Sequence, residues 1–245
     1  MGTKWVYKVK PDSTFKARLV ALGWSQVPGK DCGSTFSPVC RLQSIRMVLA
    51  IAAEQDLEVI QLDVKTVFLY ADIEEDVFVE MTPSFETTDK KGVRFVMKLG
   101  KSLYGLAQSP QNWWRTIDPR RVEIGFVSLK TDTCVYIYNH DDVVIIITLY
   151  VDDLLVAGRN IQVIETVKKK LADKFEISDM GDVSLVLGMK VTRDRETKTL
   201  SICKENFTKS LLECFGMRDC NTVSTPDVGA ELSTEQPEET LLNKE

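Results

Sequence analysis

The feature that most limits the fold of this chain is an apolar run, 143–157, broken by the adjacent carboxylates Asp152 and Asp153. The run is shorter than the ~20 residues that a membrane helix needs, and two charges inside it exclude a bilayer span. Its Val and Ile residues favour β-strands. We therefore predict a strand over 143–150, paired with a strand over 134–138 through a polar turn at 139–142.

The aspartate pair that follows this strand has two interpretations. Burying unpaired charge is costly and adjacent carboxylates repel each other, so a metal ion or a Lys/Arg pair would have to meet them. Alternatively, Asp152 and Asp153 form an ordinary surface hairpin turn, where Asp is common. Spacing alone leaves both interpretations open.

A third carboxylate, Asp63, ends a short apolar strand predicted over 57–62. Asp63 either caps that strand or joins Asp152 and Asp153, if the two strands are neighbours in one sheet. Gathered carboxylates suit Mg²⁺, which fills its other positions with water and substrate phosphates. Two such ions roughly 3.5 to 4 Å apart serve in-line phosphoryl displacement, so nucleotidyl transfer is the chemistry that this grouping favours.

Two cations, Lys16 and Arg18, are two residues apart on a predicted strand and so share a face. This strand, over 16–23, pairs with one over 5–10 around a turn at 11–13. Such a cation pair would hold a triphosphate, although a solvated strand face is the alternative.

The remaining pattern predicts an α+β protein with helices packed on one face of the sheet. Ser44 is expected to N-cap a helix to about Glu54, and Pro119 to kink or stop a helix over 108–125 near Asp118. Further helices are expected over 161–176 and around 207–215, and further strands over 77–81, 93–99, 183–192 and 199–203.

Net charge seems at first to exclude nucleic acid, because the chain carries 31 Lys+Arg against 36 Asp+Glu. Residues 1–46, however, carry +6, whereas residues 227–245 carry −5 and are expected to form a disordered acidic tail. The six cysteines show no C-x-x-C pair, and we expect buried, reduced thiols. Without a signal-peptide pattern, we expect an intracellular, cytoplasmic protein that is not secreted.

Six segments in order now identify a family resemblance: KARLVALGWSQ (16–26), TFSPVCRLQSIR (35–46), QLDVKTVFL (61–69), KSLYGLAQSP (101–110), LYVDDLLVAG (149–158) and LGMKVTRD (187–194). The chain resembles the reverse transcriptase of copia-type LTR retrotransposons over residues 4–226. The resemblance implies a right-hand polymerase core with a mixed, largely antiparallel sheet. It divides residues 1–226 into fingers (about 1–56), palm (about 57–158), and palm end with thumb start (about 159–226).

The resemblance also implies roles for individual residues. The catalytic, metal-binding carboxylates would be Asp63, Asp152 and Asp153, with the Val64 carbonyl as a further ligand of two Mg²⁺ ions or, in their place, Mn²⁺. The residues around the incoming nucleotide would be Lys16 and Arg18 on the triphosphate, Phe68 as the gate against a ribose 2′-hydroxyl, and Tyr104 and Gly105 at the pocket border. Phe68 as an ordinary core phenylalanine remains the alternative. The residues on the template and primer side would be Gln108, Ser109 and Pro110, which begin the supporting helix, and Tyr150.

The implied function is RNA-directed DNA polymerisation on an RNA or DNA template with a primer and deoxynucleoside triphosphates. No membrane partner is implied; in an intact element the partners are the rest of the Pol polyprotein, within a virus-like particle. Ala107 and Gln111 stand where the family usually has cations, and ribonuclease H, protease and integrase regions are not recognised. The alternative is therefore a catalytically dead retrotransposon remnant that binds nucleic acid or protein at most.

Overall fold

The computed structural model describes residues 1–10, 13–82, 85–140 and 143–224. The chain divides into one unit of Met1–Cys203 and a second of Lys204–Glu245. The predicted tail (227–245) and parts of the predicted turns (11–12 and 141–142) lie outside the described residues.

A six-stranded sheet forms the centre of the first unit, and each of its strand pairs is antiparallel. Its strands in spatial order are β10 (Ile177–Asp182), β3 (Glu58–Val64), β9 (Asp153–Gly158), β8 (Val143–Tyr150), β7 (Val135–His140) and β6 (Val127–Ser128). The predicted strand over 143–150 is confirmed as β8, and the predicted strand before Asp63 is β3, which continues through Asp63 to Val64. Strand β10 was not predicted.

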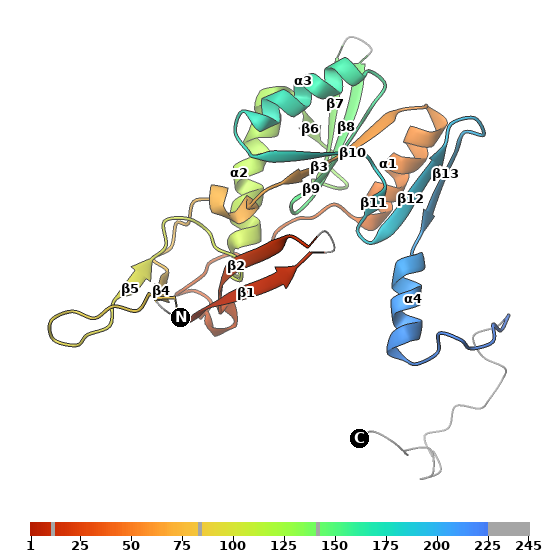
Figure 1. Ribbon diagram of the computed structural model, residues 1–245. Helices are drawn as coiled ribbons and strands as arrows, with labels where there is room; N and C mark the ends of the chain where they lie inside the picture. The colour runs from red at the N-terminus through yellow and green to blue at the C-terminus, as the bar shows by residue number, and fades with distance from the viewer. Residues whose placement is uncertain (11–12, 83–84, 141–142, 225–245) are drawn as a thin grey trace. The chain divides into compact units, whose positions relative to one another are not determined.

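Helices cover both faces of this sheet, so the prediction of helices on one face is wrong. Side chains of helix α1 (Leu42–Glu54) line a cavity together with Ile146 of β8, so α1 lies on the face of the sheet that carries Ile146. Helix α3 (Ile161–Ala172) instead meets the other face, where Ile164 lies against Gly158, the register partner of Ile145. Figure 1 shows α3 and α2 (Ser109–Ile124) on one side of the strands and α1 on the other. Both faces of the central strands are consequently buried, which explains their continuous apolar sequence.

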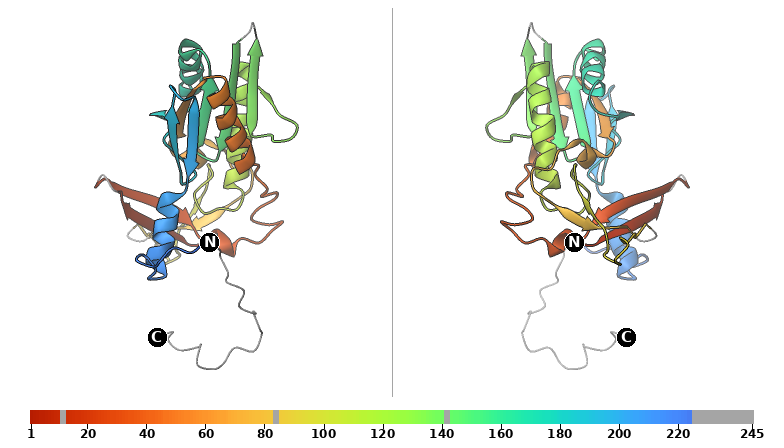
Figure 2. Two further views of the ribbon diagram at one scale, coloured as in Figure 1. Left: turned by 90° about the vertical axis from the view of Figure 1, so that its right-hand side faces the viewer. Right: turned by 90° about the vertical axis from the view of Figure 1, so that its left-hand side faces the viewer.

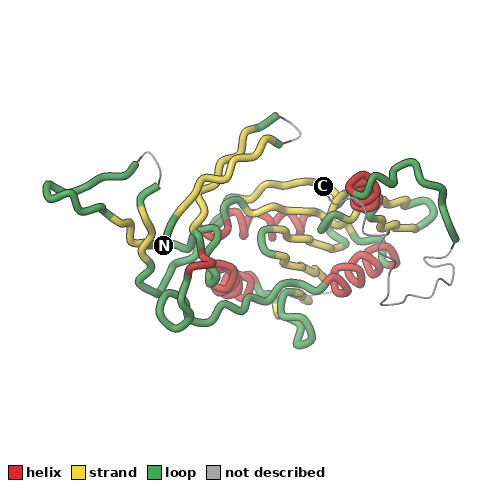
Figure 3. The backbone as a smooth tube through the Cα atoms, turned by 90° about the horizontal axis from the view of Figure 1, so that it is seen from below, coloured by secondary structure: helices red, strands yellow, loops and turns green. Residues whose placement is uncertain are grey.

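Smaller sheets surround the centre. The predicted N-terminal hairpin is confirmed as β1 (Thr3–Val9) and β2 (Phe15–Ala21), which projects from the central sheet in both views of Figure 2. The pair β4 (Phe78–Glu80) and β5 (Val96–Lys98) forms a second arm, seen beside the first in Figure 3. A three-stranded sheet joins β11 (Leu185–Val186), β12 (Met189–Asp194) and β13 (Thr199–Cys203). Two 3₁₀ turns complete the unit, η1 (Gly23–Ser25) and η2 (Val67–Tyr70).

Helix α2 runs through Pro119 to Ile124, so the predicted stop near Asp118 is wrong, while the other predicted outcome, a kink at this proline, stays a prediction. Proline costs an interior helix about 3 kcal/mol, because one hydrogen bond is lost and its ring crowds a carbonyl. The next two residues compensate: Arg120 donates to the Lys170 carbonyl of α3 at 2.7 Å, and Arg121 pairs with Asp118 within α2 at 2.8 Å.

The N-terminus of α1 also differs from the prediction. The helix begins at Leu42 with Arg41 as N-cap, and Ser44 lies inside its first turn. The Ser44 hydroxyl donates instead to the Asp132 carboxylate at 2.7 Å. The Ser44 hydroxyl, which was predicted to cap the helix, therefore bonds instead to Asp132, a residue distant in the sequence.

In the second unit, α4 (Glu205–Cys214) confirms the predicted helix around Phe207 and Leu211, with Gly216 beyond its end. The cysteines are free, but the expectation that all are buried is wrong: Cys32, Cys40 and Cys134 are buried, and Cys203, Cys214 and Cys220 are exposed. None of the helices described combines the length and the apolar character that crossing a bilayer requires.

Candidate active site

Four polar side chains form a row across the central sheet. Strand register places Ser178 of β10 beside Asp63 of β3, Asp63 beside Asp153 of β9, and Asp153 beside Tyr150 of β8. Register partners project on the same face of an antiparallel sheet. The structure thus brings Asp63 and Asp153 together from adjacent strands.

The third carboxylate, Asp152, lies in the two-residue turn between β8 and β9. Its neighbour Val151 has φ of 55°, which is unusual for a β-branched residue and costs of the order of 1–3 kcal/mol. Two hydrogen bonds hold this turn: buried Trp113 donates from Nε1 to the Val151 carbonyl at 2.7 Å, and the Val64 amide donates to the Asp152 carbonyl at 3.0 Å. The strained turn is therefore fixed next to Asp63 rather than free at the surface.

A cavity of about 560 Å³, a size typical of small-ligand sites, is bordered by Ser178, Asp63 and Asp153 of this row and by Asp152, whereas Tyr150 does not line it. One side is the tip of the β1–β2 hairpin, including Lys16 and Arg18, and the other side is the carboxylate row. The described lining residues are Lys10, Thr14, Phe15, Lys16, Ala17, Arg18, Gln61, Asp63, Val64, Lys65, Thr66, Tyr104, Asp152, Asp153, Ser178 and Met180. Cations and carboxylates thus face one space from separate sheets.

The electrostatics of the carboxylates are unbalanced. Burial raises the pKa of Asp63, and repulsion from Asp152 adds to this effect, against the opposing influence of Lys16 and Arg18. Burial also raises the pKa of Asp153, despite a hydrogen bond from Gln61. Raised carboxylate pKa values indicate that the protein supplies less positive charge and fewer donors than these groups need.

The cations are arranged along the hairpin. Burial lowers the pKa of Lys16, and the neighbouring charges of Arg18 and Lys10 lower it further. The Arg18 guanidinium lies 4.8 Å from the centre of the Tyr104 ring, within range of a cation–π contact. This concentration of positive charge would favour an anionic ligand in the cavity.

Two of the predicted nucleotide-site residues do not line the cavity. Phe68, half-buried in η2, packs edge-on against Tyr104 with ring centres 4.9 Å apart. Gly105, at φ of 91°, meets the end of β2: a Cβ there would lie 2.1 Å from the Ala21 carbonyl oxygen. The Ala21 amide donates to the Tyr104 carbonyl at 2.8 Å, so this close approach fastens the hairpin beside the site.

The residues predicted on the template side use their side chains within the chain. Buried Gln108 donates to the Asp31 carbonyl at 3.1 Å and accepts from Gln26 at 2.9 Å. The buried Ser109 hydroxyl donates to the Leu103 carbonyl at 2.7 Å, and Pro110 occupies the first turn of α2. As predicted, these residues begin a helix, and their contacts fix where it starts.

Sequence reasoning missed two parts of the site. Ser178 and Met180 belong to β10, which falls between the helix predicted to Glu176 and the strand predicted from residue 183. The sequence over 177–182 does not alternate apolar and polar residues, so it offered no local signal for a strand. The second omission is Trp113, whose bond to the turn joins residues 38 positions apart and leaves no local trace.

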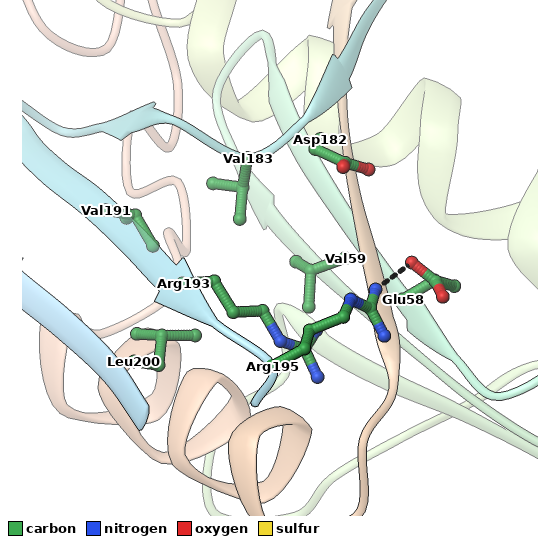
Figure 4. A pocket seen from close by; sticks show the side chains of 8 residues that line it. All are labelled: Glu58, Val59, Asp182, Val183, Val191, Arg193, Arg195 and Leu200. Atoms are coloured by element: carbon green, nitrogen blue, oxygen red, sulfur yellow. Dashed lines mark hydrogen bonds and ion pairs between the residues drawn. The ribbon is translucent and has the colours of Figure 1, made fainter. Parts of the chain in front are cut away.

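A second cavity, of about 210 Å³, lies among β3, β10 and β12, and it contains two arginines (Figure 4). Arg195 pairs with Glu58 across it, and Arg193 donates to the carbonyls of Ala52 and Leu57. Both arginines also pair with Asp56. These contacts attach β12 to the end of α1 and the start of β3, so the arginines are already used within the fold.

The described residues contain no group of three or more His, Cys, Asp or Glu side chains arranged to hold a metal ion. The three site aspartates border one cavity without forming a closed ligand set. Mg²⁺ does not need a closed set, because it usually binds one or two protein carboxylates together with water and phosphate oxygens.

Fold and cavity together define an α+β protein in which sheet carboxylates face the cations of a separate hairpin. The sequence model of the family "Reverse transcriptase (RNA-dependent DNA polymerase)" matches residues 1–229, and the chain belongs to this family. The resemblance found in the six segments is thereby confirmed.

Relatives of the chain are transposon polyproteins. It is 40% identical over 232 residues to the Retrovirus-related Pol polyprotein from transposon TNT 1-94 of Nicotiana tabacum, covering 92% of this chain and 17% of that protein. It is 32% identical over 231 residues to the corresponding polyprotein from transposon RE1 of Arabidopsis thaliana, covering 92% and 16%. It is 28% identical over 203 residues to the Transposon Ty1-DR1 Gag-Pol polyprotein of Saccharomyces cerevisiae, covering 80% and 11%. The chain thus spans about a sixth or less of the length of these relatives.

Proposed function

We propose that this reverse transcriptase domain retains polymerase activity and adds deoxynucleotides to a primer 3′-hydroxyl on an RNA or DNA template. The observation that carries the proposal is the cavity in which Asp63, Asp152 and Asp153 face Lys16 and Arg18. A triphosphate needs cations, and the reacting phosphorus needs a cluster of metal-binding carboxylates, so one cavity holds both requirements.

Each part of the fold has a proposed polymerase role. The β1–β2 hairpin would belong to the fingers, the sheet with Asp63 and Asp153 to the palm, and the chain beyond Arg159 would begin the thumb. In an intact element the partners would be the remaining segments of an intracellular Pol polyprotein. The support for this assignment is the family match and the separation of the hairpin from the sheet.

The carboxylates fit Mg²⁺ by their chemistry. Burial and repulsion by Asp152 raise the pKa values of Asp63 and Asp153, and a bound divalent cation would relieve both effects. The proposed protein ligands are Asp63, Asp152, Asp153 and the Val64 carbonyl. When bound, Mg²⁺ would acidify the primer hydroxyl and neutralise charge on the phosphates.

The residues of the chain then have distinct tasks. Lys16 and Arg18 bind the triphosphate oxygens, and this holds the α-phosphorus in reach of the primer hydroxyl. The bond from the primer oxygen to phosphorus forms as the bond to pyrophosphate breaks, and the two cations stabilise the charge on the leaving group. The Phe68 ring, held by Tyr104, would exclude a 2′-hydroxyl. Gln108, Ser109 and Pro110 would support the template through α2, and Tyr150 would contact the primer end.

The alternative is a catalytically dead remnant, and a helix broken at Pro119 would have favoured it. That argument loses its force because α2 is continuous. Single-nucleotide primer extension in Mg²⁺ or Mn²⁺ separates the two functions, with Asp152→Asn as the inactive variant. The matched control is Asp182→Asn, an exposed aspartate of the same sheet outside the cavity lining.

The proposal expects incorporation by the wild type and by Asp182→Asn, and its loss in Asp152→Asn. Equal incorporation by the wild type and Asp152→Asn, or none by either, would contradict it. Mg²⁺ binding followed by calorimetry gives a readout independent of activity, since Asp152→Asn should weaken it and Asp182→Asn should not.

A further inference from the structure

Strand β10 provides one wall of the candidate site. Ser178 and Met180 line the cavity, and Ser178 is the register partner of Asp63. Asp179, between them, pairs in register with Leu62 and so lies on the other face of the sheet. Because of this alternation, any contact that holds Asp179 also fixes the two side chains that face the ligand.

This wall has little support from the sheet itself. Among the described strands, β10 is an edge strand with β3 as its one neighbour, and its register shifts between Asp179 and Asp182. The register shift is a β-bulge, in which one extra residue bends the strand. Gly181 takes φ of 73° there, and its amide donates to the Asp179 carboxylate at 2.8 Å. The position of the wall therefore depends on what holds Asp179.

Lys168 of α3 holds Asp179 in place. Its side chain is only 14% exposed and forms ion pairs with Asp179 and, at 2.5 Å, with Glu165. Burial alone would lower the pKa of Lys168, but the hydrogen bonds to Asp179 and Glu165 outweigh this and raise it. The hydrogen bond from Lys168 likewise lowers the pKa of Asp179. Both groups are charged at neutral pH, so the contact is a charge-assisted link between α3 and β10.

We propose that the Lys168–Asp179 ion pair is a positioning pair for the nucleotide site, which sets the wall formed by Ser178 and Met180 against the incoming deoxynucleoside triphosphate. The inference rests on the proposed function. Neither Lys168 nor Asp179 lines the cavity, so both act through the strand between them. Small displacements of a wall far from the chemistry lower rates by up to ~100-fold.

Lys168→Met tests the pair because it removes the charge and keeps most of the aliphatic stem. Lys169→Met is the matched control, since Lys169 is the exposed next residue of α3 and has no ion pair among the described residues. Lys168→Arg is the conservative variant. The measurement is equilibrium binding of a fluorescent deoxynucleoside triphosphate with Mg²⁺ to protein bound to a primer–template whose primer lacks a 3′-hydroxyl. Nucleotide KM and kcat are then measured on an extendable primer.

Lys168→Met should weaken nucleotide binding and raise the nucleotide KM about tenfold, with a smaller change in kcat and in primer–template affinity. Lys169→Met should match the wild type, and Lys168→Arg should restore most of the loss. Wild-type binding by a folded Lys168→Met, or equal weakening by both Met variants, would overturn the inference. Should Lys168→Met not fold, Asp179→Asn decides, because it removes the pair from its half-exposed partner and keeps an acceptor for the Gly181 amide.

The binding measurement also separates this inference from the proposed function. A wild type that binds the nucleotide but does not extend the primer contradicts polymerase activity alone, and the ratio of affinities between wild type and Lys168→Met still decides the role of the pair. A wild type that binds no nucleotide contradicts both.

Discussion

Asp132 is buried and Asp63 is half-buried in the same unit, and their pKa values shift in opposite directions. Burial alone would raise the pKa of Asp132, but donors outweigh it: the Ser44 hydroxyl at 2.7 Å, the Arg41 amide at 2.9 Å and the Cys134 amide at 3.1 Å. The pKa of Asp132 is therefore lowered. Among the residues described, no donor bonds to the carboxylate of Asp63, and its pKa is raised.

This difference distinguishes a carboxylate that stabilises the fold from one that is available to a ligand. Asp132 joins the start of α1 to the segment before β7, and its charge is satisfied within the chain. The charge of Asp63 is satisfied only in part, by cations across a cavity. Unsatisfied charge in a cleft costs stability, so it marks a candidate functional site.

The largest expected effect is on catalysis by Asp63→Asn. Removing one oxygen ligand and its charge should lower single-nucleotide incorporation roughly 100- to 1000-fold, the range seen when one preorganised electrostatic contact is lost. The free energy of unfolding without divalent metal should not fall, because the lost charge was repelled by Asp152. Primer extension and urea unfolding of the same preparation measure both. Retained incorporation, or a large loss of stability, would remove the contrast with Asp132.

The opposite result is expected for Asp132→Ala. The substitution leaves the Ser44 hydroxyl and the Arg41 and Cys134 amides without their acceptor, so unfolding should become easier by about 1–3 kcal/mol. Incorporation per folded molecule should stay within about twofold, because distant sites act independently. Unchanged stability in urea, or selective loss of incorporation, would contradict a purely structural role for Asp132.

Both aspartates also show what the sequence could and could not predict. Strand β8 has the bounds expected from its β-branched content, and β13 has its predicted bounds, because such signals are local. The approach of Asp63 to Asp153 was predicted on the condition that their strands are neighbours, and β3 and β9 are paired. The role of Asp132 was not predicted, because its donor Ser44 lies 88 residues away.

The incorrect predictions have the same physical origin. Pro119 carries a local penalty that is visible in the sequence, whereas the bond from Arg120 that helps to compensate for it reaches Lys170 of another helix. Strand β10 pairs with β3, more than one hundred residues earlier, and its own residues do not alternate apolar and polar. Local patterns thus predicted most elements, and long-range polar contacts decided where the cavity walls lie.

A smaller effect is expected for Trp113→Phe, which keeps the packing of the ring against Phe175 but removes the donor to the Val151 carbonyl. Loss of one hydrogen bond should cost about 1 kcal/mol of unfolding free energy. Since that bond holds the strained turn before Asp152, kcat should fall about tenfold with little change in primer–template affinity. A control is Trp114→Phe, because among the residues described the buried indole nitrogen of Trp114 makes no hydrogen bond to the turn. Equal kcat losses in both variants would show that the turn does not depend on Trp113.

The smallest effect is the pH dependence of stability, and it has opposite signs for the two aspartates. The pKa of Asp132 lies below the ordinary value of 3.8, so its charged form stabilises the fold above that value, and this contribution is lost as pH falls through the folded pKa. The pKa of Asp63 lies above 3.8, so its charge opposes folding near neutral pH, and this penalty disappears below 3.8. In metal-free urea titrations from pH 7 to pH 3, Asp132→Asn should be less stable than the wild type and Asp63→Asn more stable. Both differences in unfolding free energy from the wild type should shrink as the pH falls. If both variants were more stable than the wild type, or both less stable, the two carboxylates would not have opposite effects on stability.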